Sequence, residues 1–166
     1  QHLAFGEPFI DGDCTIDLAA TDFRTTTYFN SPTACFPADF AGPWPIAETP
    51  DGTEVDLSKV SPKGEPYADM CFIKGLEKGE YAIANKKLGM TVKLLWDKEL
   101  FPYVTYINVT GGLKGYPFYG RWYFVGLELW TTFSDQYDEV KANGSMTTLQ
   151  PFEVKSADIQ LEVIQD

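Results

Sequence analysis

The sequence predicts an all-β protein, an antiparallel β-sandwich with one short helix. Three observations support this prediction. Segments that alternate between apolar and polar residues, or are rich in β-branched and aromatic residues, recur along the chain. Turn-forming residues separate these segments at intervals of about 8–12 residues, which is typical of a sandwich. Only one segment combines the residues that start a helix with those that stop one.

The first half of the chain is predicted to hold short strands and irregular loops. Residues 14–18 alternate between apolar and polar side chains, and residues 25–29 are β-branched and aromatic, so both segments are typical of strands. Residues 31–66 contain seven prolines and several glycines, which predicts long surface loops around at most a short strand. Residues 70–73 form a short apolar run.

The second half holds the more regular strand segments. They are residues 80–84, 88–96, 103–109 and 122–130. The first two flank Asn85-Lys86-Lys87, a sequence that favours a hairpin turn. The last two are the most strand-like segments of the chain, because aromatic and β-branched residues dominate them.

The end of the chain is predicted to contain the helix and a final strand. Ser134 is a candidate N-cap, acidic residues follow it, and Gly144 is a stop signal, so the helix is expected over residues 134–142. Ile159, Leu161 and Val163 alternate with polar residues. This alternation predicts a strand with one solvent-facing side.

Length and composition favour one globular domain over residues 1–166. Apolar residues make up 44% of the chain and charged residues 22%, as in a folded protein. No stretch approaches the roughly 20 apolar residues that a membrane-spanning helix needs, so no membrane partner is expected. The formal net charge is −11, and residues 1–58 carry ten acidic residues against one basic residue. This charge argues against nucleic-acid binding, which depends on clustered Lys and Arg.

Cysteine and histidine usage predicts neither a disulfide framework nor a metal site. Cys14, Cys35 and Cys71 are an odd number of cysteines and lack the spacing of zinc ligands. His2 is the only histidine, so most metal sites and most Ser-His-Asp arrangements are not expected.

His2 and Glu128 are the candidate catalytic residues. Histidine suits general acid catalysis because its unperturbed pKa lies nearest neutrality, although a lone histidine near a chain end is usually an exposed bystander. Glu128 interrupts the apolar run 124–130, where a carboxylate is costly to bury unless it is paired or used. The alternative is that Glu128 lies on the solvent face of an alternating strand.

An aromatic segment supplies candidate ligand-binding residues. Residues 115–122 include Tyr119, Arg121 and Trp122. Aromatic faces stack on the C–H faces of sugar rings, and an arginine beside them can donate hydrogen bonds to hydroxyl groups. The alternative is that these side chains only pack within a hairpin loop.

Several segments, taken in their order and spacing, point to one known family. They are residues 1–9, 13–18, 100–103, 115–121, 126–128, 144–151 and 159–161. Together they resemble the aldose 1-epimerases, or galactose mutarotases, over nearly the whole chain. His2-Leu3-Ala4-Phe5-Gly6 looks like the segment around that family's catalytic histidine. Gly126-Leu127-Glu128 looks like the strand that carries its catalytic glutamate.

This resemblance implies both a fold and an activity. The implied fold is a partial sandwich of the galactose mutarotase-like (supersandwich) type, because the chain resembles the C-terminal half of the family. The implied activity is the interconversion of the anomers of a free aldose, without metal or organic cofactor. His2 matches the acid that protonates the ring oxygen, and Glu128 matches the base that deprotonates the anomeric hydroxyl. Asp69 resembles the aspartate that holds substrate hydroxyls.

The same reasoning gives an expected assembly and two alternative functions. Half of a large sandwich leaves sheet edges uncovered, so a homodimer or a rebuilt edge is expected. The first alternative is a non-catalytic carbohydrate-binding module, which would take a mono- or oligosaccharide as the epimerase would. The second is a β-sandwich interaction domain without a sugar ligand. Dependence of activity on His2 and Glu128 would separate catalysis from binding alone.

Overall fold

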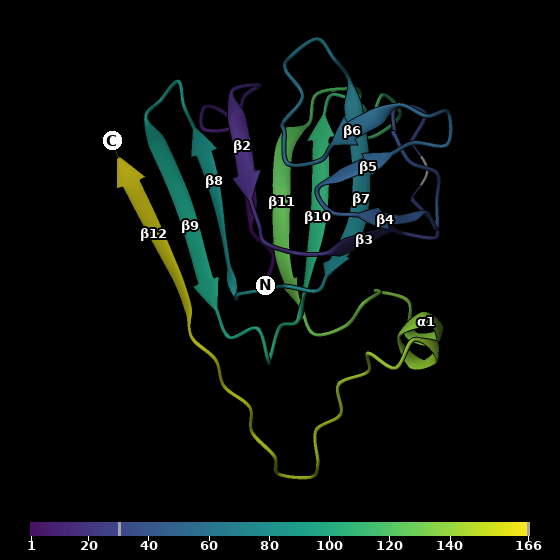
Figure 1. Ribbon diagram of the computed structural model, residues 1–166, viewed down its shortest axis with the longest axis vertical. Helices are drawn as coiled ribbons and strands as arrows, with labels where there is room; N and C mark the ends of the chain where they lie inside the picture. The colour runs from purple at the N-terminus through teal and green to yellow at the C-terminus, as the bar shows by residue number, and fades with distance from the viewer. Residues whose placement is uncertain (30, 166) are drawn as a thin grey trace.

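Two antiparallel sheets, a small two-stranded sheet and one short helix make up the described part of the chain (Figure 1). The computed structural model describes residues 1–29 and 31–165. The predicted all-β class with one short helix is therefore confirmed, and the two larger sheets share one apolar core in a sandwich-like arrangement.

The larger sheet has six strands, in the order β1-β11-β10-β7-β3-β4. Its strands are β1 (Ala4–Gly6), β3 (Asp22–Thr25), β4 (Ala41–Pro43), β7 (Tyr67–Lys74), β10 (Tyr103–Thr110) and β11 (Tyr123–Trp130). The three central strands each have eight residues, so they form the rigid part of the sheet.

The second sheet has four strands, in the order β12-β9-β8-β2. Its strands are β2 (Cys14–Asp17), β8 (Glu80–Asn85), β9 (Met90–Trp96) and β12 (Ile159–Gln165). The predicted hairpin is present, since β8 and β9 pair from Glu80–Leu95 to Asn85–Met90. The small sheet pairs β5 (Ile46–Glu48) with β6 (Glu54–Asp56).

The core lies between the two larger sheets and is rich in aromatic residues. Tyr81 of β8 reaches across to β11, where its hydroxyl donates a 3.3 Å hydrogen bond to the Leu127 carbonyl. Its ring also lies 6.4 Å from the ring of Phe5, edge to face. Val125, Leu127 and Leu129 of β11 are all buried against this layer. The alternate residues of β11 therefore face away from the core.

The loop region 31–66 is more structured than the sequence predicts. It carries three short strands, β4, β5 and β6, where at most one was expected. Each has three residues, too few for an alternating pattern to be visible in the sequence. The strand predicted at residues 25–29 lies earlier, as β3, because pairing with both β4 and β7 fixes its position.

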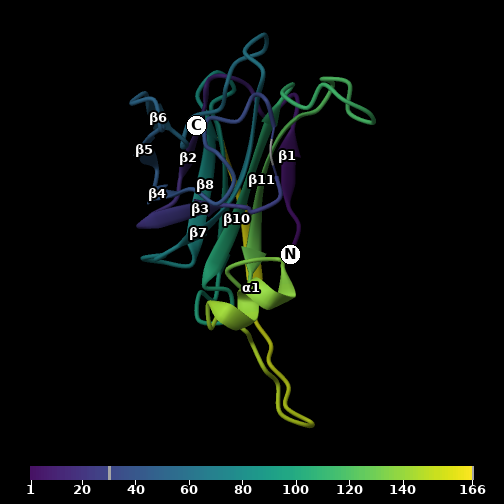
Figure 2. The same ribbon diagram turned by 90° about the vertical axis from the view of Figure 1, so that its right-hand side faces the viewer.

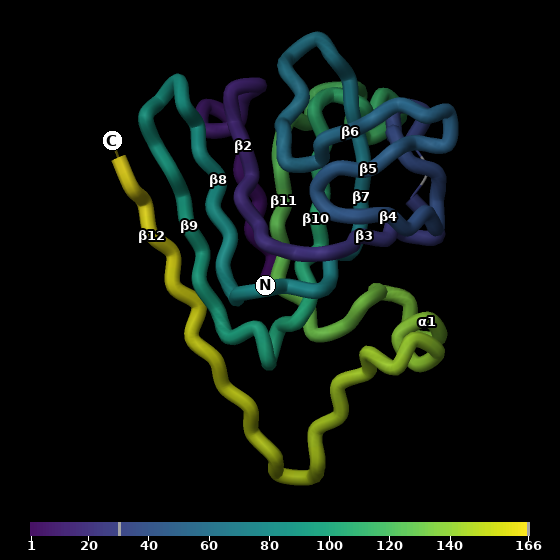
Figure 3. The backbone as a smooth tube through the Cα atoms, in the orientation of Figure 1, coloured from purple at the N-terminus to yellow at the C-terminus, as the bar shows by residue number. Residues whose placement is uncertain are grey.

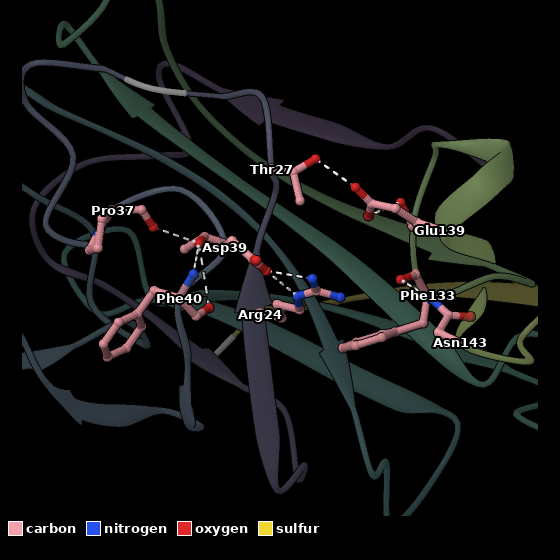
Figure 4. Close-up of polar contacts among 10 residues, drawn as sticks. Arg24, Thr27, Pro37, Asp39, Phe40, Phe133, Glu139 and Asn143 are labelled. Atoms are coloured by element: carbon pink, nitrogen blue, oxygen red, sulfur yellow. Dashed lines mark hydrogen bonds and ion pairs between the residues drawn. The ribbon is translucent and has the colours of Figure 1, made fainter. Parts of the chain in front are cut away.

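The helix is shorter than predicted, and Ser134 is not its N-cap. α1 spans Tyr137–Ala142 and follows Gln136 as its N-cap. Ser134 shapes the preceding turn instead, where its hydroxyl accepts a hydrogen bond from the Gln136 N–H and donates one to Glu139. Glu139 also accepts the Thr27 hydroxyl at 2.7 Å, which ties α1 to the segment after β3 (Figure 4).

The C-terminal strand differs from the prediction of one solvent-facing side. β12 pairs with β9 along its whole length, yet most of its residues are exposed on both faces. The connection from α1 to β12 runs away from the sheets and returns, as Figures 2 and 3 show. The final strand therefore lies at the margin of the sandwich.

Replacing Leu127 by alanine should test the assignment of the core. Leu127 is fully buried on β11, so we expect Leu127→Ala to lower the free energy of unfolding by about 2–5 kcal/mol. Urea unfolding followed by circular dichroism measures the change. Leu149→Ala is the matched control, because Leu149 is exposed and its loss should cost less than about 0.5 kcal/mol. Equal effects of the two substitutions would contradict the assignment.

Candidate functional site

His2 and Glu128 occupy opposite positions on neighbouring strands. β1 pairs with β11 in a register that sets Ala4 opposite Gly126. The pairing continues towards the start of the chain, because the Leu127 N–H donates a hydrogen bond to the Leu3 carbonyl. Continued by one more residue, this antiparallel register sets His2 directly opposite Glu128. The pairing of β1 with β11 thus brings together two residues that lie far apart in the sequence.

The two side chains are in direct contact. His2 Nδ1 lies 2.5 Å from Glu128 Oε1. The His2 side chain is 73% exposed, whereas that of Glu128 is only 8% exposed. The second carboxylate oxygen, Oε2, accepts a 3.3 Å hydrogen bond from Trp130 Nε1. The pair therefore links a largely buried carboxylate to an imidazole that solvent and ligands can reach.

Thr105 flanks Glu128 on the other side. It lies opposite Glu128 in the pairing of β10 with β11 and is fully buried. Its hydroxyl has no hydrogen-bond partner among the described residues. A buried hydroxyl without a partner costs free energy, so this group is available to bond the carboxylate when the side chain of Glu128 shifts.

An apolar groove of about 750 Å³ lies on the same outer face of the six-stranded sheet. Its floor and one wall are formed by Met70, Ile107, Val109, Phe118, Trp122 and Phe124. Phe118 and Trp122 pack edge to face with ring centroids 4.2 Å apart. His2 lines this groove and also a smaller hollow of about 410 Å³ that contains Glu128. The histidine thus stands between the carboxylate and the groove.

Gly126 keeps the space between Glu128 and the groove open. It lies on the outer face of β11, two residues before Glu128. A Cβ atom added at Gly126 would lie 3.7 Å from Glu128 Oε1 and 3.5 Å from the Cβ of Ile107. An alanine therefore fits here without strain, whereas a larger side chain would project into this space.

The aromatic segment contributes two of its three candidate residues to the groove. Arg121 and Trp122 line it, in the connection between β10 and β11. Tyr119 does not line it and is exposed, with its ring 5.9 Å from the guanidinium carbon of Arg121. Tyr119 therefore lies beside a residue of the groove without lining the groove itself.

Asp69 is not part of this group. Asp69 lies on the core side of β7, as Cys71 does, and it pairs with Asn108 of β10. Met70, the next residue of β7, faces the groove instead. The Cys35 N–H donates a 3.0 Å hydrogen bond to Asp69 Oδ2. Burial raises the pKa of Asp69 to about 6. The structure thus separates Asp69 from His2 and Glu128 by the thickness of the sheet.

Sequence reasoning missed most of the groove. Ile107 and Val109 alternate with core residues in β10, so the strand pattern together with its register could have placed them beside Glu128. Met70 gave no such signal, because β7 is buried on both faces. Phe29 also lines the groove, from a loop whose path no sequence pattern fixes.

The described residues offer no ready metal site. No cluster of three or more His, Cys, Asp or Glu side chains suited to a metal ion occurs within residues 1–29 and 31–165. The three cysteines, Cys14, Cys35 and Cys71, are free thiols. No helix in this part of the chain is long and apolar enough to cross a membrane.

Comparison with known proteins adds no assignment, since no protein-family model, curated protein or solved structure matches this chain. The chemistry of the site therefore has to be argued from its own geometry.

Replacing Asp69 by asparagine should change how stability depends on pH. Because burial raises the pKa of Asp69 from 3.8 to about 6, the folded state loses about 3 kcal/mol as the pH rises through this range. Asparagine cannot ionise but keeps an oxygen that accepts the Cys35 N–H. We therefore expect Asp69→Asn to gain stability relative to the unsubstituted protein between pH 4 and pH 7, measured by urea unfolding. A constant difference across this range would contradict the argument.

Proposed function

We propose that this protein binds an aldose on the outer face of the six-stranded sheet and interconverts its anomers, with His2 as acid and Glu128 as base. The observation that carries the proposal is the contact between the two side chains, 2.5 Å apart beside the groove. Their residue types suit proton transfer near neutral pH. The resemblance of the sequence to aldose 1-epimerases supports the same assignment.

The proposed reaction consists of two coupled proton transfers. Glu128 removes the proton from the anomeric hydroxyl O1 while His2 gives a proton to the ring oxygen O5. The C1–O5 bond breaks, and the electrons of the O1–H bond form the aldehyde carbonyl. Rotation about the C1–C2 bond followed by the reverse steps closes the ring as the other anomer. No atom is gained or lost, and no electron acceptor is needed.

The closeness of the two groups suits this chemistry. O1 and O5 are bonded to the same carbon, so the acid and the base must act on two neighbouring atoms. By contrast, the two carboxyl groups of a retaining glycosidase stand about 5 Å apart, on opposite sides of the sugar ring. The contact between His2 Nδ1 and Glu128 Oε1 supports this assignment, because a sugar bound beside it could reach both groups at once.

The groove supplies surfaces that can hold the sugar. Phe118 and Trp122 offer aromatic rings for the C–H faces of a pyranose, and Arg121 can donate hydrogen bonds to its hydroxyls. Glu128 lies in the neighbouring hollow rather than in the groove itself. A sugar that reaches the carboxylate must therefore displace His2 from its contact or pass beside it, over Gly126.

The apolar character of the groove also favours the second candidate function, a non-catalytic sugar-binding module. Among the described residues that line the groove, only His2 and Arg121 carry side chains that can be charged near neutral pH. Stacking on Phe118 and Trp122 would then supply most of the affinity, with no role for Glu128. A substitution at Glu128 distinguishes these two functions, and a substitution at Trp122 tests the sugar binding that both require.

Glu128→Gln should abolish most of the activity. Glutamine keeps the shape of the side chain but cannot take up a proton, so we expect the rate of mutarotation to fall about 10²- to 10⁴-fold. Polarimetry on freshly dissolved glucose and galactose measures the rate. Glu54→Gln is the matched control, because Glu54 is the exposed residue of β6, and it should leave the rate unchanged. A protein without activity, or one that keeps its activity in Glu128→Gln, would contradict the assignment of Glu128 as the base.

Trp122→Ala should weaken sugar binding whether or not the protein is a catalyst. Loss of one stacking ring is expected to raise the dissociation constant about 2- to 12-fold. Calorimetric titration with glucose, galactose and a panel of their oligosaccharides measures the change. Tyr116→Ala is the control, because Tyr116 lies in the same loop but is exposed outside the groove. Absence of binding to every sugar would favour the interaction-domain function instead.

A further inference from the structure

Exposed apolar side chains are concentrated near the C-terminal end of the chain. More than half of the large exposed hydrophobic residues belong to the stretch 146–164. They are Met146, Leu149, Phe152, Val154, Ile159, Leu161, Val163 and Ile164. On a folded protein, a concentration of exposed apolar side chains is more often an interaction surface than a result of chance.

β12 is the one long strand with a free edge among the described residues. It has seven residues and pairs with β9 on one side only. The other outermost strands are short or covered. β1 and β4 have three residues each, and β2 has four and is bridged by the segment that follows β6, through the pairing of Thr15 with Lys59.

The free edge of β12 also lacks the features that prevent strands from pairing with other molecules. Natural edge strands are protected by lysines, prolines, bulges or short length. β12 contains no lysine or proline, its pairing with β9 is continuous, and Glu162 is its only charged residue. Its backbone N–H and C=O groups on the outer side are therefore ready to accept another strand.

One face of β12 continues the apolar face of the sandwich core. Ile159, Leu161 and Val163 lie opposite Trp96, Leu94 and Val92 of β9, all three of which are buried. The β12 residues are 40%, 49% and 61% exposed because the six-stranded sheet does not reach over them. The core side of the four-stranded sheet therefore has an uncovered apolar margin.

We propose that β12 pairs in antiparallel fashion with β12 of a second copy, around a two-fold axis at Leu161. This register sets Leu161 against its own copy and Ile159 against Val163 of the other chain. It also sets Gln160 against Glu162, so an amide donor faces a carboxylate at two symmetric places. The two four-stranded sheets then form one continuous eight-stranded sheet.

The neighbouring register is less favourable. An axis at Glu162 would place the two Glu162 carboxylates directly opposite each other, and like charges at facing positions destabilise a sheet. In the proposed register, each Glu162 lies between Lys93 of its own β9 and Gln160 of the other copy. Pairing at this edge leaves the groove open, because the groove lies on the other sheet. The proposal therefore stands independently of the sugar-binding function.

The first test is the mass of the protein in solution. Sedimentation velocity or light scattering over a concentration series should show a particle of twice the chain mass of 18.6 kDa. Val163→Lys places a charge on the apolar face of the free edge and should yield monomers. Val154→Lys is the matched control, because Val154 is exposed outside β12, and it should leave the dimer intact. A monomer at all concentrations would overturn the proposal.

The second test concerns the register and uses Gln160, an exposed residue whose Nε2 donates a 2.7 Å hydrogen bond to Glu162 Oε1 within β12. Gln160→Lys would face each Glu162 with an opposite charge, and Gln160→Glu would face it with a like charge. We expect the dimer dissociation constant to fall about 2- to 30-fold in the first variant and to rise similarly in the second. Changes of the same sign in both variants, or no change in either, would overturn this register. Circular dichroism spectra that match the unsubstituted protein establish that each variant is folded.

Discussion

The register of β11 between β10 and β1 is the constraint on which the candidate site depends. Val125, Leu127 and Leu129 face the core, and burial of each such side chain is worth about 1.5–3 kcal/mol. A slip of one residue would send all three to the outer face and bring Glu128 into the core. The same apolar contacts that stabilise the sandwich therefore hold the carboxylate beside the groove.

The two members of the acid–base pair depend on each other unequally. Glu128 is nearly buried, and His2 and Trp130 are the groups that contact its two oxygens. Loss of His2 would leave a buried carboxylate with one weak hydrogen bond, which costs folding free energy as well as activity. Loss of the Glu128 carboxylate would leave His2 exposed to water, at little cost in folding. The histidine thus contributes to the stability of the base that it would assist.

Sequence reasoning was most accurate where a single pattern determines the structure. The strand-like composition of the segments that became β9, β10 and β11 marked their limits to within two residues, but it left the face of Glu128 open. Sequence reasoning was least accurate where strand pairing, and not the local sequence pattern, determines the structure. The three short strands between residues 31 and 66 exist only through contacts with partners, and no local pattern signals them.

The residues of the candidate site were likewise predictable only in part. His2 and Glu128 could be selected by residue type and by resemblance to a family, and the structure places them in contact. Asp69 was selected by resemblance alone and lies on the core side of β7. The groove itself is assembled from strands β1, β7, β10 and β11 and two loops, so its existence follows from tertiary structure that no segment encodes separately.

The position of β12 at the margin of the sandwich affects where local unfolding begins. The strand follows a long, mostly exposed connection that runs away from the sheets, and its own residues are mostly exposed as well. Its detachment therefore costs only a fraction of the global unfolding free energy, and its amides exchange with solvent hydrogen through a local opening of their own. In that partly opened state β9 becomes the outermost strand, with Trp96 and Leu94 uncovered on one flank. The four-stranded sheet therefore stays intact only as long as β12 remains paired with β9.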